Sequence, residues 1–168
     1  MSLRRASKRS SGGQRGDAEA ALTAAVALLA RRDYASSELR EKLRARAFDE
    51  GSPAAAVTDL TRQGALDDER YARNYVAYRA ARGQGPIRIA AELRRHGLPP
   101  ELIEAALAAG PDWEGLARRV RRARFGALPP ASWAQKARQA RFLQYRGFSS
   151  DHIRAATGAD PDTGPTEP

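Results

Sequence analysis

Apolar side chains recur along this chain at helical spacing, in short runs bounded by glycine, proline and capping residues. Tyr71, Tyr75 and Tyr78 lie at positions i, i+4 and i+7, which predicts a helix that presents all three rings to the core. The pair Gly85-Pro86 then ends this helix and begins another, because proline is tolerated at the first helical position. This pattern is typical of two helices joined by a tight loop.

Capping residues mark the ends of several predicted helices. Asp67 is a good N-cap for the tyrosine-bearing helix. Gly97 is expected to end the following helix in a left-handed conformation. Ser132 and Gln135 have the spacing of a capping box, and Ser149 is expected to cap the last short helix.

The same apolar pattern recurs at an interval of 50 residues. The second copy consists of Ile89, Leu93, Gly97, Leu98, Ile103 and Ala106, the third of Gln139, Leu143, Gly147, Phe148, Ile153 and Ala156, and the first of Leu39, Leu43, Ala47, Phe48, Pro53 and Ala56. A fixed period of this length indicates one helical unit used three times. The sequence therefore predicts an all-α fold of three tandem three-helix repeats that form an elongated, curved array.

The predicted segments are a disordered basic tail (1–16), helical repeats one (17–66), two (67–110) and three (111–157), and a second disordered tail (158–168). In repeat one, Leu22, Val26 and Leu29 are predicted to form the apolar stripe of the first helix. Ala47 replaces the glycine of the other copies, at a cost of about 1 kcal/mol in a left-handed cap, and an insertion at 49–53 follows. The second helix of this repeat is therefore expected to end differently.

The amino-acid composition excludes several classes of protein and of functional site. The chain has no cysteine, which excludes disulfides, thiolate metal sites and a cysteine nucleophile. No stretch contains enough consecutive apolar residues to span a bilayer, and no secretory signal is recognised, so a cytoplasmic protein is expected. The net charge of +9 favours a polyanionic partner or one with an acidic surface.

Residues that support catalysis are sparse. His96 and His152 lie far apart, and neither has a second ligand at metal-binding spacing. Asp67 and Asp68 are better explained as helix-capping groups than as a catalytic pair. The sequence Gly83-Gln84-Gly85 lacks the lysine-serine ending of a phosphate loop. We therefore expect no enzyme activity, no metal and no cofactor.

Clustered arginines give the strongest functional signal in the composition. Nine basic residues and no acidic one lie between Arg118 and Ser150. A solvated helix usually alternates the sign of its charges, so this asymmetry indicates contacts to phosphates or to an acidic protein groove. A general arginine bias of the genome is the simpler alternative. The predicted basic face consists of Arg79, Arg82, Arg88, Arg95, Arg118, Arg121, Arg122, Arg138 and Arg141.

Two aromatic residues lie among these arginines. Phe142 and Tyr145 have the chemistry to stack on bases, as in proteins that bind single-stranded nucleic acid. Aromatic side chains at helical spacing more often belong to the core, and we predict a core position for both.

Three motifs together resemble the RecX family of bacterial regulatory proteins. They are Leu66-Asp67-Asp68 with Tyr71-Ala72, Gly83-x-Gly85-Pro86-x-Arg88-Ile89 with Glu92-Leu93 and Gly97, and Arg138-x-x-Arg141-Phe142-Leu143 with Arg146-Gly147-Phe148. Leu39 and Leu43 add to the match, which covers about residues 18–157. The sequence departs from the family at His96, where lysine is frequent, and at Ala47.

The resemblance implies a protein without catalysis of its own that lies in the groove of the RecA–DNA filament. Such proteins suppress the ATPase, strand-exchange and co-protease activities of RecA, and so modulate recombination, DNA repair and the SOS response. The expected partners are the RecA nucleoprotein filament and single- or double-stranded DNA, with no membrane, and the chain is expected to be a monomer. The alternatives are a helical protein that binds nucleic acid directly and a helical scaffold without affinity for DNA.

Overall fold

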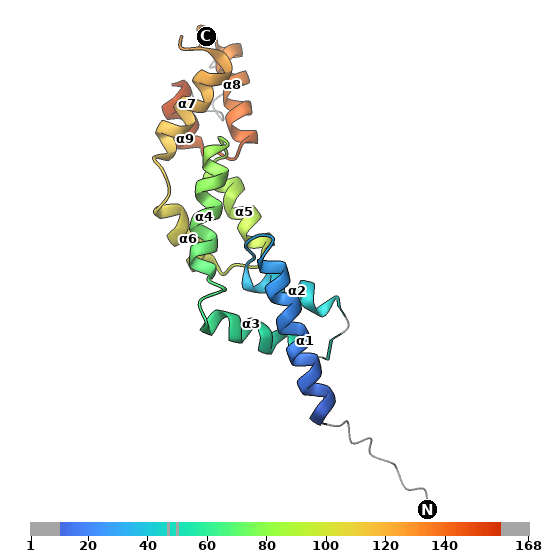
Figure 1. The fold of residues 1–168 in the computed structure, drawn as a ribbon. Helices are drawn as coiled ribbons and strands as arrows, with labels where there is room; N and C mark the ends of the chain where they lie inside the picture. The colour runs from blue at the N-terminus through green and yellow to red at the C-terminus, as the bar shows by residue number, and fades with distance from the viewer. Residues whose placement is uncertain (1–10, 47, 50, 159–168) are drawn as a thin grey trace, which may run out of the picture. The chain divides into compact units, whose positions relative to one another are not determined.

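The computed structural model describes residues 11–46, 48–49 and 51–158, which form helices and connecting turns with no strand among them (Figure 1). The prediction of an all-α fold is therefore confirmed. The chain divides into two compact units, residues 1–68 and residues 69–168. Each unit is described by itself below.

The first unit contains three helices, α1 (Ser11–Leu29), α2 (Ser36–Arg44) and α3 (Ser52–Arg62). α1 packs on α3, and α2 contacts both. Their shared core consists of Ala21, Ala25, Tyr34, Leu39, Leu43, Ala56, Val57, Leu60 and Leu66. Because α2 and α3 are too short to be stable alone in water, this packing is what stabilises them.

Two details of the first unit differ from the sequence prediction. Of the predicted stripe, Leu22 and Leu29 pack partly buried against the core, but Val26 is 51% exposed, and the fully buried face of α1 carries Ala21 and Ala25. α1 also begins at Ser11, inside the stretch predicted as a tail.

The insertion predicted after residue 47 is shorter than expected. α3 begins at Ser52, and the Asp49 carboxylate accepts a hydrogen bond from the Ser52 N–H at 2.8 Å. The second half of the predicted insertion is therefore the first turn of a helix. Ala47, whose backbone conformation was predicted from the repeat, lies outside the described residues.

The second unit begins with α4 (Asp68–Ala81), α5 (Pro86–Arg95) and α6 (Pro100–Ala108). α4 starts directly after Asp67, and α5 begins with proline, as the sequence predicted; α6 begins with proline as well. Gly97 follows α5 with φ +77°, which confirms the predicted left-handed conformation. The buried side chains of these helices include Val76, Ile89, Leu93 and Ile103.

The second unit continues with α7 (Trp113–Phe125), α8 (Trp133–Tyr145) and α9 (Ser150–Thr157). Their core consists of Leu116, Ala117, Ala140, Leu143, Phe148 and Ile153, joined by Ala80 of α4. A side chain of the second repeat thus completes the core of the third. The two repeats therefore form one packed unit.

Side-chain caps fix the starts of the last three helices. The Asp112 carboxylate accepts from the Gly115 N–H at 3.0 Å, and the Ser132 hydroxyl accepts from the Gln135 N–H at 3.3 Å. Ser149 forms a full capping box, in which the third helical residue, His152, accepts from the Ser149 N–H through its ring nitrogen Nδ1. This histidine therefore serves as a helix-capping residue.

Candidate nucleic-acid interface

Two of the sequence motifs meet at a junction made of backbone. The N–H of Gly85 donates to the carbonyl of Arg146 at 2.8 Å, and the N–H of Ile87 donates to the carbonyl of Gly147 at 3.0 Å. A Cβ at Gly85 would overlap the Gly147 carbonyl, and a Cβ at Gly147 would overlap the Cβ of Arg88. Glycine is therefore required at both positions, because the backbone segments at Gly85 and Gly147 approach each other too closely for a side chain.

The Arg146 side chain reinforces this junction from the other direction. Its guanidinium donates to the carbonyl of Arg82 at 3.0 Å and stacks 5.0 Å from the centre of the Phe142 ring. The loop after α4 and the loop after α8 are thus held together at several points. The arginines on α4, α5 and α8 are consequently presented on one fixed framework.

Two of the predicted interface arginines are held by a buried carboxylate. Glu92 of α5 is 6% exposed and accepts from the Tyr75 hydroxyl at 3.0 Å, from Arg79 Nε at 2.6 Å and from Arg88 Nε at 3.3 Å. Burial alone would raise the pKa of Glu92, but the hydrogen bonds from Arg79, Tyr75 and Arg88 hold that pKa below its ordinary value. Glu92 is therefore charged at neutral pH.

The same contacts affect the partners of Glu92. Burial and the neighbouring carboxylate raise the pKa of Tyr75. Burial would lower the pKa of Arg79, yet its hydrogen bond to Glu92 raises it. Arg79 is therefore a largely buried cation that holds α4 to α5, Arg88 pairs with Glu92 within α5, and the charge of both is largely balanced within the fold.

Arg121 does not lie on the exposed face. It is 5% exposed, and its guanidinium donates to the carbonyls of Gly126 and Leu128 in the loop between α7 and α8. The buried positions Leu116 and Ala117 lie one helical turn earlier on the same helix, so the helical period itself places Arg121 on the core side. Its role in the structure is to shape this loop.

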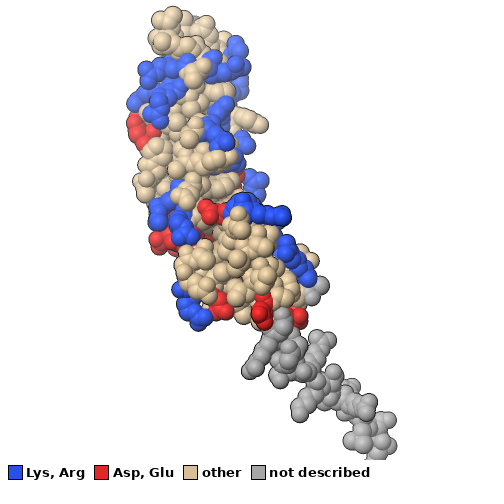
Figure 2. Space-filling model, in the orientation of Figure 1, with Lys and Arg blue, Asp and Glu red and all other residues tan. Residues whose placement is uncertain are grey.

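The remaining predicted interface residues lie at the surface. Arg82, Arg95, Arg118, Arg122, Arg138 and Arg141 are exposed. Arg118 pairs with Glu114 at 3.0 Å, and Arg82 stacks 3.6 Å from the centre of the Tyr78 ring. In the view of Figure 2, basic side chains lie along both flanks of the region built by α7, α8 and α9, and acidic ones there are confined to one edge.

Two tyrosines predicted to belong to the core are instead exposed. Tyr78 is 52% exposed and Tyr145 is 79% exposed, whereas Tyr71 is buried and Phe142 packs against the core of the third repeat. The guanidinium of Arg88 lies 5.8 Å from the centre of the Tyr145 ring. Tyr145 therefore offers an open aromatic face beside a cation, an arrangement suited to stacking on a nucleic-acid base.

Within the described part of the chain, no group of three or more histidine, cysteine or acidic side chains is arranged to hold a metal ion. His96 packs edge-on to Tyr71 and Tyr75, at 6.0 and 5.4 Å between ring centres. Across the described residues, none of the helices has the length and apolar content needed to span a membrane.

Three family models match the chain in succession. They are the first three-helix domain of RecX over residues 21–60, the second over residues 67–107 and the third over residues 113–157. These ranges contain nearly all the core residues of the three helical groups described above. The predicted three-helix repeats are therefore confirmed.

Curated relatives agree with the family models. The chain is 45% identical to regulatory protein RecX of Halorhodospira halophila over 151 residues, which cover 88% of this chain and 94% of that protein. It is also 45% identical to regulatory protein RecX of Stenotrophomonas maltophilia strain R551-3 over 139 residues, covering 82% and 85% of the two chains.

Solved structures share the fold at lower identity. The crystal structure of RecX from Lactobacillus salivarius superimposes with a TM-score of 0.75 at 21% identity, covering 84% of this chain and 94% of that one. A second crystal structure of regulatory protein RecX gives a TM-score of 0.73 at 22% identity, covering 87% and 74%. The three matched domains and the close relatives together show that this chain belongs to the RecX family of regulatory proteins.

Proposed function

We propose that this protein binds the filament that RecA forms on DNA and inhibits its ATPase, strand-exchange and co-protease activities, without catalysis of its own. It would thereby modulate recombination, DNA repair and the SOS response. The observation that supports this most is the exposed cationic surface of α7 and α8, which contains Arg122, Arg138 and Arg141 together with Arg118, the last of these paired with Glu114. No acidic residue lies between Arg118 and Ser150. Such a surface attracts the DNA phosphates at the axis of the filament.

The backbone junction between the second and third repeats gives this surface a mechanical role. Because α4, α5 and α8 are fixed to one another through Gly85 and Gly147, a protein bound along the filament would hold neighbouring RecA protomers in one arrangement. ATP turnover requires those arrangements to change. A bound clamp therefore slows turnover without occupying the nucleotide site.

The decisive experiment is a titration of this protein into RecA that is hydrolysing ATP on single-stranded DNA. Inhibition at well below one copy per RecA protomer supports the proposal, since a clamp acts on more than the protomer it touches. Inhibition only near saturation of the DNA indicates competition for DNA instead. Full ATPase activity at every ratio, with DNA binding intact, would overturn the proposal.

A second candidate is direct binding of nucleic acid as the whole function. The exposed ring of Tyr145 beside Arg88 favours it, because open aromatic faces stack on unpaired bases. It predicts the same affinity for single-stranded DNA with and without RecA, whereas the filament proposal predicts tighter binding to RecA-coated DNA. Fluorescence anisotropy of a labelled oligonucleotide distinguishes the two.

A further inference from the structure

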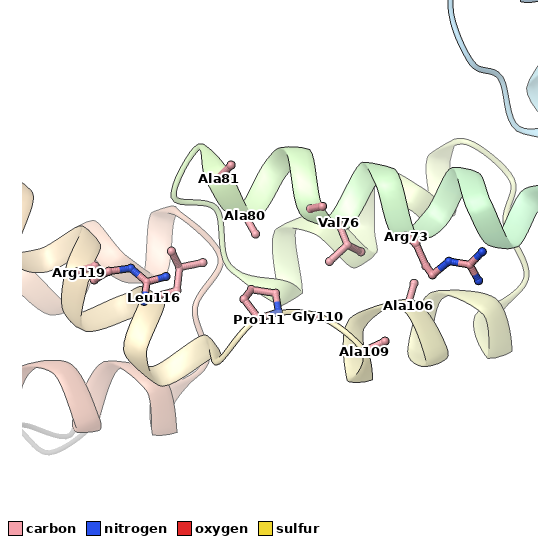
Figure 3. A pocket seen from close by; sticks show the side chains of 11 residues that line it. Arg73, Val76, Ala80, Ala81, Ala106, Ala109, Gly110, Pro111, Leu116 and Arg119 are labelled. Carbon is pink, nitrogen blue, oxygen red and sulfur yellow. The ribbon is translucent and has the colours of Figure 1, made fainter.

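A hollow outside the cationic surface lies where α4, α6 and the start of α7 meet within the second unit (Figure 3). It encloses about 590 Å³ and has an apolar floor, to which the buried side chains of Val76, Ala80, Ala106 and Leu116 contribute. Its rim includes the exposed residues Ala77, Ala81 and Ala109. Small side chains at the rim let the backbone of a bound segment approach closely.

Two cations border this apolar floor. Arg73 of α4 and Arg119 of α7 lie at opposite ends of the lining in Figure 3, and both are exposed. Arg73 also forms an exposed ion pair with Glu69 at 3.4 Å. A smaller hollow of about 180 Å³ continues between α4 and α6, and it shares Arg73, Ala106 and Ala109 with the first. Among the described residues that line the larger hollow, none is acidic, and Glu69 lines only the smaller one.

The lining indicates the chemical class of the occupant. It includes no aromatic ring on which a base would stack, so it does not suit the unpaired nucleotides that Tyr145 suits. Aliphatic walls favour an aliphatic or aromatic side chain of a protein, and arginine at the rim favours carboxylates on the same segment. The charge and shape of the hollow therefore match an acidic protein segment with an apolar anchor.

We propose that this hollow is a protein-docking site that takes an apolar side chain from an acidic segment of the partner; this rests on the proposed function, under which the partner is RecA. The chain then has two separate contact surfaces. The cationic surface of α7 and α8 contacts DNA, and the hollow between α4, α6 and α7 contacts the protein.

The test compares matched substitutions at exposed alanines. Ala77→Glu places a carboxylate over the apolar floor, and Ala55→Glu makes the same change on α3, which contributes no residue to the lining of the hollow. Circular dichroism confirms that both variants are folded. Binding of DNA-free RecA to the immobilised chain is expected to weaken by about tenfold or more for Ala77→Glu and to stay unchanged for Ala55→Glu. The affinity of both variants for a single-stranded oligonucleotide is expected to be equal.

A second pair of variants tests the cationic rim. Arg119→Glu and Arg124→Glu change the net charge equally, and both positions are exposed on α7, but only Arg119 lines the hollow. Weaker binding of RecA by Arg119→Glu than by Arg124→Glu is the expected result, with equal losses in oligonucleotide affinity.

The outcomes separate the two proposals. Equal RecA binding by Ala77→Glu and Ala55→Glu overturns the docking site and leaves the proposed function standing. A parallel loss of RecA and oligonucleotide affinity in Ala77→Glu also overturns it, because the hollow would then serve nucleic acid. Failure of the unmodified chain to bind RecA, with or without DNA, overturns the proposed function and the docking site together.

Discussion

Glu92 joins two helices through a single buried carboxylate. Tyr75 and Arg79 reach it from α4, and Arg88 reaches it from the preceding turn of α5. A buried charge is tolerated only where hydrogen bonds replace the water it has lost, and here three donors do so. This carboxylate therefore determines how α4 and α5 pack against each other.

Replacing Glu92 with glutamine should destabilise the protein by about 2 kcal/mol at pH 7, because hydrogen bonds to a charged group are lost or weakened. The folded-state pKa of Glu92 lies below its ordinary value of 4.5, so its contribution to stability is complete above that pH and is lost as the pH falls through the folded-state pKa. The difference between Glu92→Gln and the unmodified protein should therefore shrink in acid. Urea denaturation at several pH values measures it.

Glu114→Gln is the matched control for this prediction. Glu114 pairs with Arg118 at 3.0 Å, but both side chains are exposed, so the change should cost less than about 1 kcal/mol. Equal losses for the two variants, or a Glu92→Gln deficit that does not change with pH, would contradict the role assigned to Glu92.

The positions of single residues in the structure show what helical spacing can and cannot predict. Spacing correctly placed Tyr71 in the core, but Tyr78 and Tyr145 are exposed because no neighbouring element covers those positions. Periodicity defines which residues share a face, whereas tertiary packing decides how far along the helix that face is covered. The burial of Arg121 could have been predicted, because it lies about one helical turn after the apolar residues Leu116 and Ala117. Its charge led instead to its assignment to the exposed basic face.

At the scale of elements, the prediction of helices and their ends succeeded where local chemistry determines them. Proline at the start of α5 and α6, and the serine caps of α8 and α9, are decided by neighbours along the chain. The junction between Gly85 and Gly147 could not be predicted in this way. It depends on contacts between loops about 60 residues apart, and each motif alone gives only a turn.

Substitution of Gly147 tests this junction. Gly147→Ala must adopt φ +90° and also place its Cβ against Arg88, so it should lower the free energy of unfolding by about 3 kcal/mol or more. Gly64→Ala, at φ +71° in open space, should cost only about 1 kcal/mol. Urea denaturation measures both, and similar losses would show that the loops separate readily.

For the whole molecule, the net charge of +9 predicts binding to DNA that weakens steeply with salt. The structure shows which of the positively charged side chains are exposed and can therefore contact DNA phosphates. Arg79 and Arg88 are engaged by Glu92 and Arg121 is buried, whereas Arg122 and Arg141 are exposed. The sequence alone defines the total charge. Which arginines form ion pairs within the fold and which are exposed to solvent depends on how the helices pack.

Neutralising exposed arginines should therefore change the salt dependence itself. Each of Arg122→Ala and Arg141→Ala is expected to reduce the slope of log affinity for single-stranded DNA against log salt by about 0.7, the value for one lost phosphate contact. Arg62→Ala on α3, where Arg62 pairs with Asp59, should leave the slope unchanged. Anisotropy titrations across a salt series provide the slopes, and identical slopes for all three variants would exclude the α7–α8 surface from DNA contact.

The junction between the two loops has a consequence for how this molecule tolerates change. Two of its hydrogen bonds join peptide groups, and every residue except proline can donate such a bond through its N–H. The space beside Gly147 is bounded by the backbone and the Cβ of Arg88, which all residues except glycine share. The exposed Ile87 can therefore be exchanged for any residue except proline without altering these hydrogen bonds, whereas Gly85 and Gly147 leave no room for a Cβ. An engineer could change the exposed side chains around this joint, keeping Arg146 because its guanidinium also donates to the Arg82 carbonyl, and still retain the geometry that two hydrogen atoms in place of side chains make possible.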